Sequence, residues 1–307
     1  MIETIFNSIT GTFNWTLRSI TWDVPWYQNY FYGLLLISLV VWGLELLFPW
    51  RKNQSAFRKD FWLDGFYMFF NFFVFSIIIS GVYELLGQGF GTIGITMKSL
   101  SLIDVSILPA WMGLLLFFVV NDFVQWSTHV MLHRVPLFLR FHRVQMGFAA
   151  HLRYHWMENI LYKPLKTFAV MLLGGFEPEQ AFIVHFIAIT IGHLNHANIR
   201  ITWGPLKYVI NNPVMHLFHH AKELPEGQTP GVNFGISLSL WDYVFKTNYI
   251  PQDQDGDYEL GFDEIQQFPK HNFLAAAYCW LWQEVASNFT LYLSLESTFF
   301  WFSCSLI

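Results

Sequence analysis

Histidine side chains are concentrated in one part of the sequence. Eleven of the twelve histidines lie within residues 129–220, and neutral imidazole is a ligand for iron, zinc, copper and nickel. The densest group is His216, His219 and His220, whose i, i+3 and i+4 spacing gathers three imidazoles within one helical turn. This group is therefore predicted to bind a metal ion.

Other histidines are paired at helical spacing, and carboxylates lie on the same predicted helix faces. These candidate ligands are His129 with His133 and Asp122, His151 with His155 and Glu158, and His193 with His196. Within these groups His155 is favoured over His151 as a metal ligand. Asp122 is expected to orient a ligand or to accept a hydrogen bond from one. His185, on the same apolar segment as His193, is interpreted as a histidine of the core.

The number of imidazoles indicates what kind of centre they form. Eight or more imidazoles exceed the ligand set of one tetrahedral zinc ion. The two cysteines, Cys279 and Cys304, exclude a disulfide scaffold and a thiolate metal site. Two metal ions that share the histidines fit the number better, and their position beside apolar segments suggests oxidative chemistry on a molecule dissolved in the membrane.

The composition indicates that the elements holding these histidines lie in a membrane. Hydrophobic residues make up 54% of the 307 residues and charged residues 13%, whereas a soluble domain has roughly 25% charged residues. This balance excludes a soluble globular protein and a disordered chain, and the net charge of −5 excludes a general nucleic-acid-binding protein. The sequence therefore predicts an all-α integral membrane protein.

Four apolar segments are long enough to enter a bilayer. Three of them, at about residues 30–48, 61–86 and 108–126, are predicted to be transmembrane helices. The fourth, at about residues 167–192, is interrupted by glycines, a proline and acids, and is predicted to be a helical hairpin that spans or re-enters the membrane. Residues 1–25 contain no compact apolar run and are predicted to be neither a signal peptide nor a span.

The remaining polar segments are predicted to form a helical cap that carries the histidines. The cap takes residues 127–165 and 193–270, so that residues 1–270 form one domain, and residues 271–307 form an apolar helical tail. The loop 51–60 holds four basic residues, and basic loops stay in the cytoplasm. The cap and its metal site are therefore expected on the cytoplasmic side.

Together the histidine motifs resemble those of the membrane fatty acid hydroxylase/sterol desaturase superfamily. The matching pieces are H-x-x-x-H at residues 129–133, R-F-H at 140–142, R-Y-H-x-x-E at 153–158, H-A-N at 196–198 and H-x-x-H-H at 216–220. The block N-F-G-x-S-L-S-L-W-D-Y-V-F-K-T that follows, Asn233 to Thr247, is similar to the tail block of that family. The resemblance covers roughly residues 30–265.

The resemblance implies a two-iron centre that uses O2 and electrons from a separate donor, such as a ferredoxin or a cytochrome, to hydroxylate or desaturate a membrane lipid. The ligands that it implies are His129, His133, His142, His155, His196, His216, His219 and His220. Asp122, Gln145, His151, Glu158 and His193 are the additional candidates for a ligand or a supporting role.

The second motif departs from the family pattern. The family has H-x-x-H-H there, whereas His142 is followed by Arg143, Val144, Gln145 and Met146, and the stretch to His155 is about five residues shorter than the family pattern. Deletion of an H-H-x-x-x block between Val144 and Gln145 would produce this sequence, and a chain that has lost two imidazole ligands is the other reading. Two alternatives stay open: a non-catalytic relative that has lost its metal centre, and a membrane zinc hydrolase that uses fewer of the same histidines.

Overall fold

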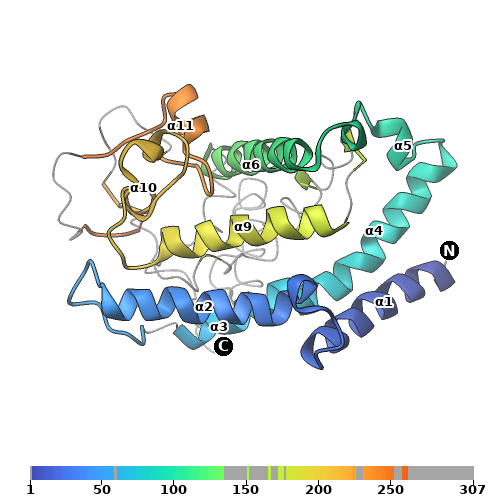
Figure 1. The fold of residues 1–307 in the computed structure, drawn as a ribbon, viewed down its shortest axis with the longest axis horizontal. Coiled ribbons are helices and arrows are strands. Elements are labelled where there is room, and N and C mark those ends of the chain that lie inside the picture. Colours follow the sequence, from blue (N-terminus) through green and yellow to red (C-terminus); the bar gives the residue numbers. More distant parts are fainter. Residues whose placement is uncertain are drawn as a thin grey trace, which may run out of the picture. The chain divides into compact units, whose positions relative to one another are not determined.

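The computed structural model describes residues 2–58, 61–134, 151, 165–166, 172–175, 178–223, 225, 231–251 and 258–261. The predicted tail 271–307 and most of the segment 135–171 lie outside the described residues. The described part is mostly helical, and its only β-structure is one two-stranded ladder and isolated bridges. The prediction of an all-α fold is therefore confirmed (Figure 1).

Three helices of the described part are long and apolar enough to cross a membrane, and they match the three predicted spans. Helix α2 is Tyr30–Leu47. The second helix is continuous from Phe61 to Thr92: α3 (Phe61–Phe69) passes through a π-helical turn, η2 (Phe70–Val74), into α4 (Phe75–Thr92). Helix α6, Ala110–Arg134, continues eight residues beyond the predicted end at residue 126, so it carries His129 and His133 within the same helix.

The predicted hairpin 167–192 is only partly helical in the described residues. Its second arm is α9, Pro178–His196. Before that arm, Leu173–Gly174 forms a strand, β2, parallel to β1 at Ile103–Asp104, which corrects the prediction of helix there. Gly175 has φ +86°, a conformation that ends a helix, and a Cβ on it would collide with Asp104. The glycines therefore allow the two backbones to pair closely.

Helix α9 connects the membrane helices to the histidine region. It packs against both α2 and α6 (Figure 1). One cluster between these helices and α3 is aromatic: the Tyr30 ring stacks on Phe72 with centroids 4.0 Å apart. His185 on α9 lies against the same two rings, at 5.5 Å from Tyr30 and 5.7 Å from Phe72. Its surroundings are those of a packed side chain.

Smaller elements complete the described part of the chain. They are η1 (Trp26–Gln28), α5 (Met97–Leu100), η3 (Val105–Ile107), η5 (Gly204–Tyr208), α10 (Pro213–His219) and α11 (Leu240–Val244). Helix α10 packs against α9 near the C-terminal end of α9.

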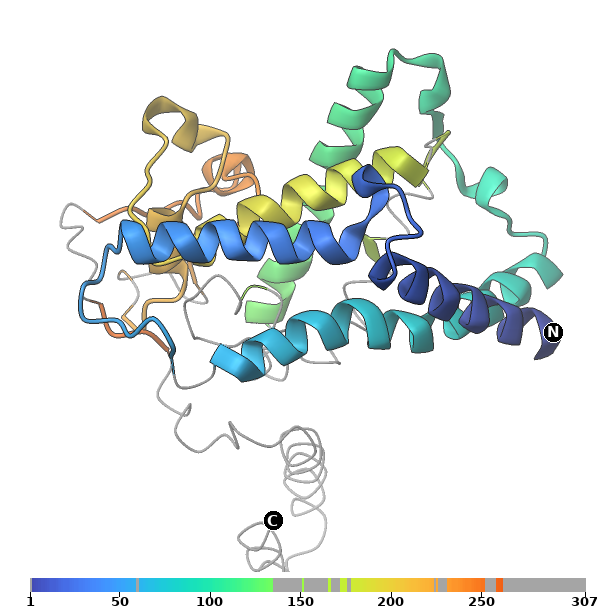
Figure 2. The same ribbon diagram turned by 60° about the horizontal axis from the view of Figure 1, so that its bottom comes forward.

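An N-terminal helix that the sequence did not predict, α1 (Ile2–Ile20), packs along α4 (Figure 2). The two helices approach closely at Gly81, where an added Cβ would lie 2.7 Å from Cδ1 of Ile9 and 3.3 Å from Cγ2 of Ile5. The Ser8 hydroxyl also donates a hydrogen bond to the carbonyl of Ser80 (3.3 Å). A glycine at residue 81 is thus what allows α1 to lie against α4.

Replacing Gly81 with leucine is expected to push α1 away from α4. Overpacking of this kind costs about 1–3 kcal/mol, so the unfolding temperature of the purified protein in detergent should fall. Gly87→Leu on the same helix is the matched control, because no atom lies within 4 Å of a Cβ at that position. Equal unfolding temperatures for the two variants would contradict the packing.

Candidate metal centre

Helix α10 is short, and its start fixes the position of three histidines. Asn212 is its N-cap: the side-chain oxygen accepts a hydrogen bond from the backbone N–H of Met215 (3.0 Å), and Pro213 takes the first helical position. His216 and His219 follow within the helix and His220 is its C-cap residue. All three imidazoles are buried.

Two histidines of α6 meet one histidine of α10. His129, His133 and His219 each offer a ring nitrogen, and these atoms lie within 4.8 Å of one another. The ring centroid of His219 is 4.5 Å from that of His129 and 4.8 Å from that of His133. We call these three residues the α6 group.

A second trio joins α9 to α10. His196, His216 and His220 also offer ring nitrogens within 4.8 Å of one another. Nε2 of His216 is 3.0 Å from Nε2 of His196 and 3.2 Å from Nε2 of His220. We call these residues the α9 group.

The spacing of the α9 group fits metal ligands. Ligands about 2.0–2.1 Å from one ion, at angles between octahedral and tetrahedral, have nitrogens about 2.8–3.4 Å apart. The Nε2 separations of 3.0 Å (His196 to His216) and 3.2 Å (His216 to His220) lie in that range. Imidazoles are donors that suit iron and zinc, so the residues present fit a bound transition metal.

The two groups are neighbours because α10 contributes to both. The rings of His216 and His219, one from each group, are stacked with centroids 5.3 Å apart, and those of His219 and His220 are 4.8 Å apart. The arrangement is therefore two adjacent groups of three histidines, each of which could hold a metal ion.

Backbone carbonyls hold several of these rings by their Nδ1 atoms. Nδ1 of His129 donates to the carbonyl of Phe234 (2.7 Å), and Nδ1 of His219 donates to that of Val232 (2.8 Å). In the α9 group, Nδ1 of His196 donates to the carbonyl of Gly192 (2.9 Å). A proton on Nδ1 leaves the lone pair on Nε2, which is the state in which a histidine binds metal through Nε2.

Burial keeps the histidines of α10 neutral. It lowers the pKa of His219 to about 4, and it lowers the pKa of His216 well below its ordinary value, with nearby His196 as a second cause. Both rings are therefore unprotonated at neutral pH, so no proton has to leave before a metal binds.

The carbonyls that hold His129 and His219 belong to one loop, residues 231–239, which we call the tail loop. Asp242 fixes it: the carboxylate accepts hydrogen bonds from the backbone N–H of Phe234 (2.9 Å) and Gly235 (2.8 Å). The same carboxylate accepts from Nε1 of Trp126 on α6 (3.0 Å). Burial raises the pKa of Asp242, and these hydrogen bonds oppose that rise.

Asp122 also holds the tail loop. Its carboxylate accepts hydrogen bonds from the backbone N–H groups of Ser237 (3.2 Å) and Leu238 (3.3 Å) and from Nε1 of Trp241 (3.1 Å). Asp122 therefore holds the loop and Trp241 of α11, and it belongs to neither histidine group.

Amide side chains connect the tail loop to the other helices. Asn195 of α9 donates to the carbonyl of Ile236 (2.6 Å), and Asn233, with φ +53°, donates to the carbonyls of Met215 (2.9 Å) and Tyr249 (2.7 Å). The sequence motifs drew attention to histidines, and these supporting residues were missed. The signal for Asn233 and Asp242 was the block Asn233 to Thr247, which contains both of them and most of the loop.

His151 and His193 lie beside the α9 group without belonging to it. Their Nδ1 atoms are 3.3 Å apart, and the His151 ring centroid is 5.1 Å from that of His196. Nε2 of His193 is 3.2 Å from Oγ of Ser38 on α2. His142, Gln145, His155 and Glu158 lie outside the described residues.

Part of the chain is similar in sequence to known proteins. A sequence model of the fatty acid hydroxylase family matches residues 114–247, which contain both histidine groups, the tail loop and Asp242. The chain is 28% identical over 139 residues to ornithine lipid hydroxylase OlsE of Rhizobium tropici; this match covers 43% of the chain and 40% of that relative. No solved structure matches the chain. Over residues 114–247 the chain is therefore similar to the fatty acid hydroxylase family, and both matches support the resemblance to the fatty acid hydroxylase/sterol desaturase superfamily.

Proposed function

We propose that this protein is a membrane lipid hydroxylase that uses two iron ions and O2. The observation that carries the proposal is the pair of adjacent three-histidine groups that share α10. The likeness to a protein named as an ornithine lipid hydroxylase supports hydroxylation and makes ornithine lipids the first substrate to assay. The other substrates of this superfamily are fatty acyl and sterol lipids. Its other reaction is desaturation.

The described histidines would hold both metal ions. One iron would bind the α6 group and the other the α9 group, with His142 and His155 as the remaining candidate ligands. Bound iron supplies the oxidation of a C–H bond by O2, with electrons from a separate donor such as a ferredoxin or a cytochrome.

The chain's own part is to hold the ligands and to keep water away. The tail loop fixes the Nδ1–H groups of His129 and His219, so that their Nε2 atoms face the centre. The α9 group is entirely buried. We expect the centre to lie on the cytoplasmic side, because the loop between α2 and α3 carries the basic residues.

Metal analysis of the purified chain tests the proposal against its rivals. Two irons per chain, together with O2-dependent conversion of an ornithine lipid or another membrane lipid, are expected. One zinc per chain with lipid hydrolysis would replace the proposal by the zinc hydrolase. A folded chain that retains no stoichiometric metal after expression in iron-supplemented medium would identify a non-catalytic relative.

A further inference from the structure

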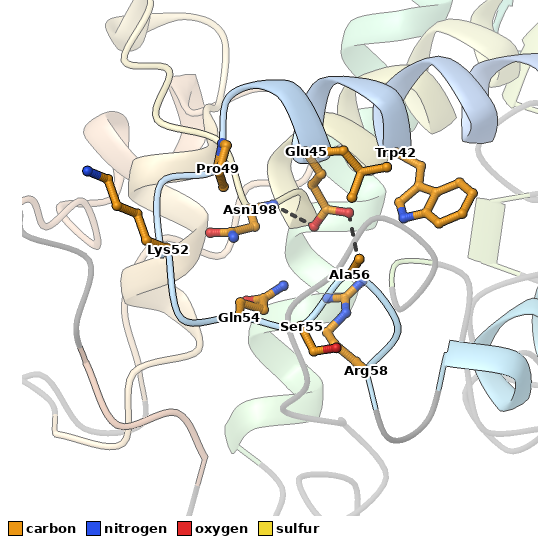
Figure 3. A pocket seen from close by; sticks show the side chains of 10 residues that line it. Trp42, Glu45, Pro49, Lys52, Gln54, Ser55, Ala56, Arg58 and Asn198 are labelled. Atoms are coloured by element: carbon orange, nitrogen blue, oxygen red, sulfur yellow. Dashed lines mark hydrogen bonds and ion pairs between the residues drawn. The ribbon is translucent and has the colours of Figure 1, made fainter.

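A pocket lies at the C-terminal end of α2, outside the histidine groups. Its volume is about 120 Å³, which is room for several water molecules and thus for a small polar group. The loop that follows α2 forms one side, and Asn198, just beyond α9, forms another. In Figure 3 the polar ends of Glu45, Gln54 and Arg58 point toward one another, the Asn198 amide turns toward the loop after α2, and Lys52 lies at the outer edge.

Glu45 is the unusual group of this pocket. It is only 6% exposed, on a helix that is long and apolar enough to span a membrane. One oxygen accepts a hydrogen bond from the backbone N–H of Asn198 (2.8 Å), and the other lies 3.9 Å from the Arg58 guanidinium, beyond hydrogen-bond distance. A carboxylate has about four acceptor positions, so within the described part of the chain this buried carboxylate keeps acceptor capacity toward the pocket.

Asn198 holds in place the loop that follows α2 and forms one side of the pocket. The Asn198 side chain accepts from the backbone N–H of Arg51 (2.9 Å) and donates to the Arg51 carbonyl (3.0 Å). Its backbone carbonyl accepts from the N–H of Trp50 (3.0 Å). The pocket is therefore a built site, in which a ligand meets groups that are already oriented.

The rest of the lining points to a lipid. Leu46 lines the pocket and is exposed, and it is followed by Leu47 and Phe48, which are 72% and 68% exposed. Exposed apolar side chains at the end of a candidate span are suited to contact acyl chains. Trp42, an aromatic typical of the membrane interface, completes that edge.

From this juxtaposition we propose that the pocket binds the head group of a membrane lipid that carries both a primary ammonium and an anionic group. The ammonium donates hydrogen bonds to Glu45, and Lys52 and Arg58 attract the phosphate or carboxylate of the same head group. The acyl chains follow the exposed apolar side chains of α2. This proposal does not depend on the oxidation chemistry proposed above.

The test compares two lipids that differ in their ammonium group. The purified full chain is mixed in detergent with phosphatidylethanolamine or with phosphatidylcholine of the same acyl chains, and lipid retained per chain is measured by native mass spectrometry. Phosphatidylcholine has no N–H to donate, so we expect phosphatidylethanolamine to bind about tenfold more tightly. If the wild-type chain retains the two lipids equally well, the proposal is overturned, and no variant is needed to show it.

Variants assign the preference to individual residues. Glu45→Gln keeps an oxygen for the Asn198 N–H and should abolish the preference, whereas Glu84→Gln, the same change outside the pocket on α4, should keep it. Lys52→Gln should weaken retention of both lipids and leave their ratio unchanged. A preference that persists in Glu45→Gln would contradict the assignment.

A soluble head group separates a lipid from a free metabolite. Phosphoethanolamine carries the same primary ammonium beside a phosphate but has no acyl chains, and at millimolar concentration it is expected not to displace the bound lipid. Displacement at the concentration at which the lipid itself binds, dependent on Glu45, would show that the pocket takes a soluble ligand and would overturn the lipid assignment. Metal content, measured in the same samples, reports separately on the histidine centre.

Discussion

Replacing His219 with alanine should remove one iron from each chain and abolish lipid oxidation. His219 is the α10 member of the α6 group, and its ring also stacks on His216 of the α9 group. Loss of a residue that only supports a metal ligand costs about 10–100-fold in metal affinity or activity, so loss of a ligand itself should cost more than that. The measurements are iron per chain and product formed per chain in the same preparation.

The two histidine groups give this experiment an internal comparison. His220→Ala removes a ligand of the α9 group, and each single variant should retain iron chiefly in the other group. A double variant, His219→Ala with His220→Ala, should retain none. His185→Phe is the control, because this ring packs against Tyr30 and Phe72 and lies in neither group. If His219→Ala keeps the iron content per chain and the activity of the wild-type protein, the two-site assignment is contradicted.

Spacing in the sequence predicted which histidines share a helix face but not how they divide between two sites. At about 100° per residue, His219 lies about 60° to one side of His216 and His220 about 40° to the other. The three side chains therefore diverge, and His219 meets α6 while His216 and His220 meet α9. That division depends on where α6 and α9 pack, which helical periodicity alone does not contain.

Elements without a long apolar run were harder to predict than the spans. Helix α1 was missed because apolar and polar residues alternate along it, and only one face, with Ile5 and Ile9, contacts α4. The β1–β2 ladder was missed because each strand has two residues. The role of the tail loop was hidden for a different reason: its contribution comes from backbone carbonyls, which any residue type provides.

The loop's dependence on one carboxylate leads to a second strong expectation. Asp242→Asn should lower the iron affinity of the chain about 10–100-fold, although Asp242 belongs to neither histidine group. One carboxylate oxygen accepts from Trp126, Phe234 and Thr247, and the other accepts from the N–H of Gly235. In asparagine one of these oxygens becomes an NH2 group, which cannot accept, so a buried N–H would be left without an acceptor.

An N–H that loses its acceptor in this way costs about 1–3 kcal/mol, and the cost falls on the loop that positions His129 and His219. Asp242→Asn should therefore bind iron more weakly at both neutral and mildly alkaline pH and should show an altered iron absorption spectrum, which a uniformly destabilised fold would not produce. Trp126→Phe removes a single donor to the same carboxylate and should have a smaller effect of the same kind.

Asp23→Asn, at an exposed aspartate whose partner is Thr21, is the control and should leave iron binding unchanged. If Asp242→Asn lowers the unfolding temperature but binds iron with unchanged affinity and spectrum, the carboxylate stabilises the fold without positioning the ligands.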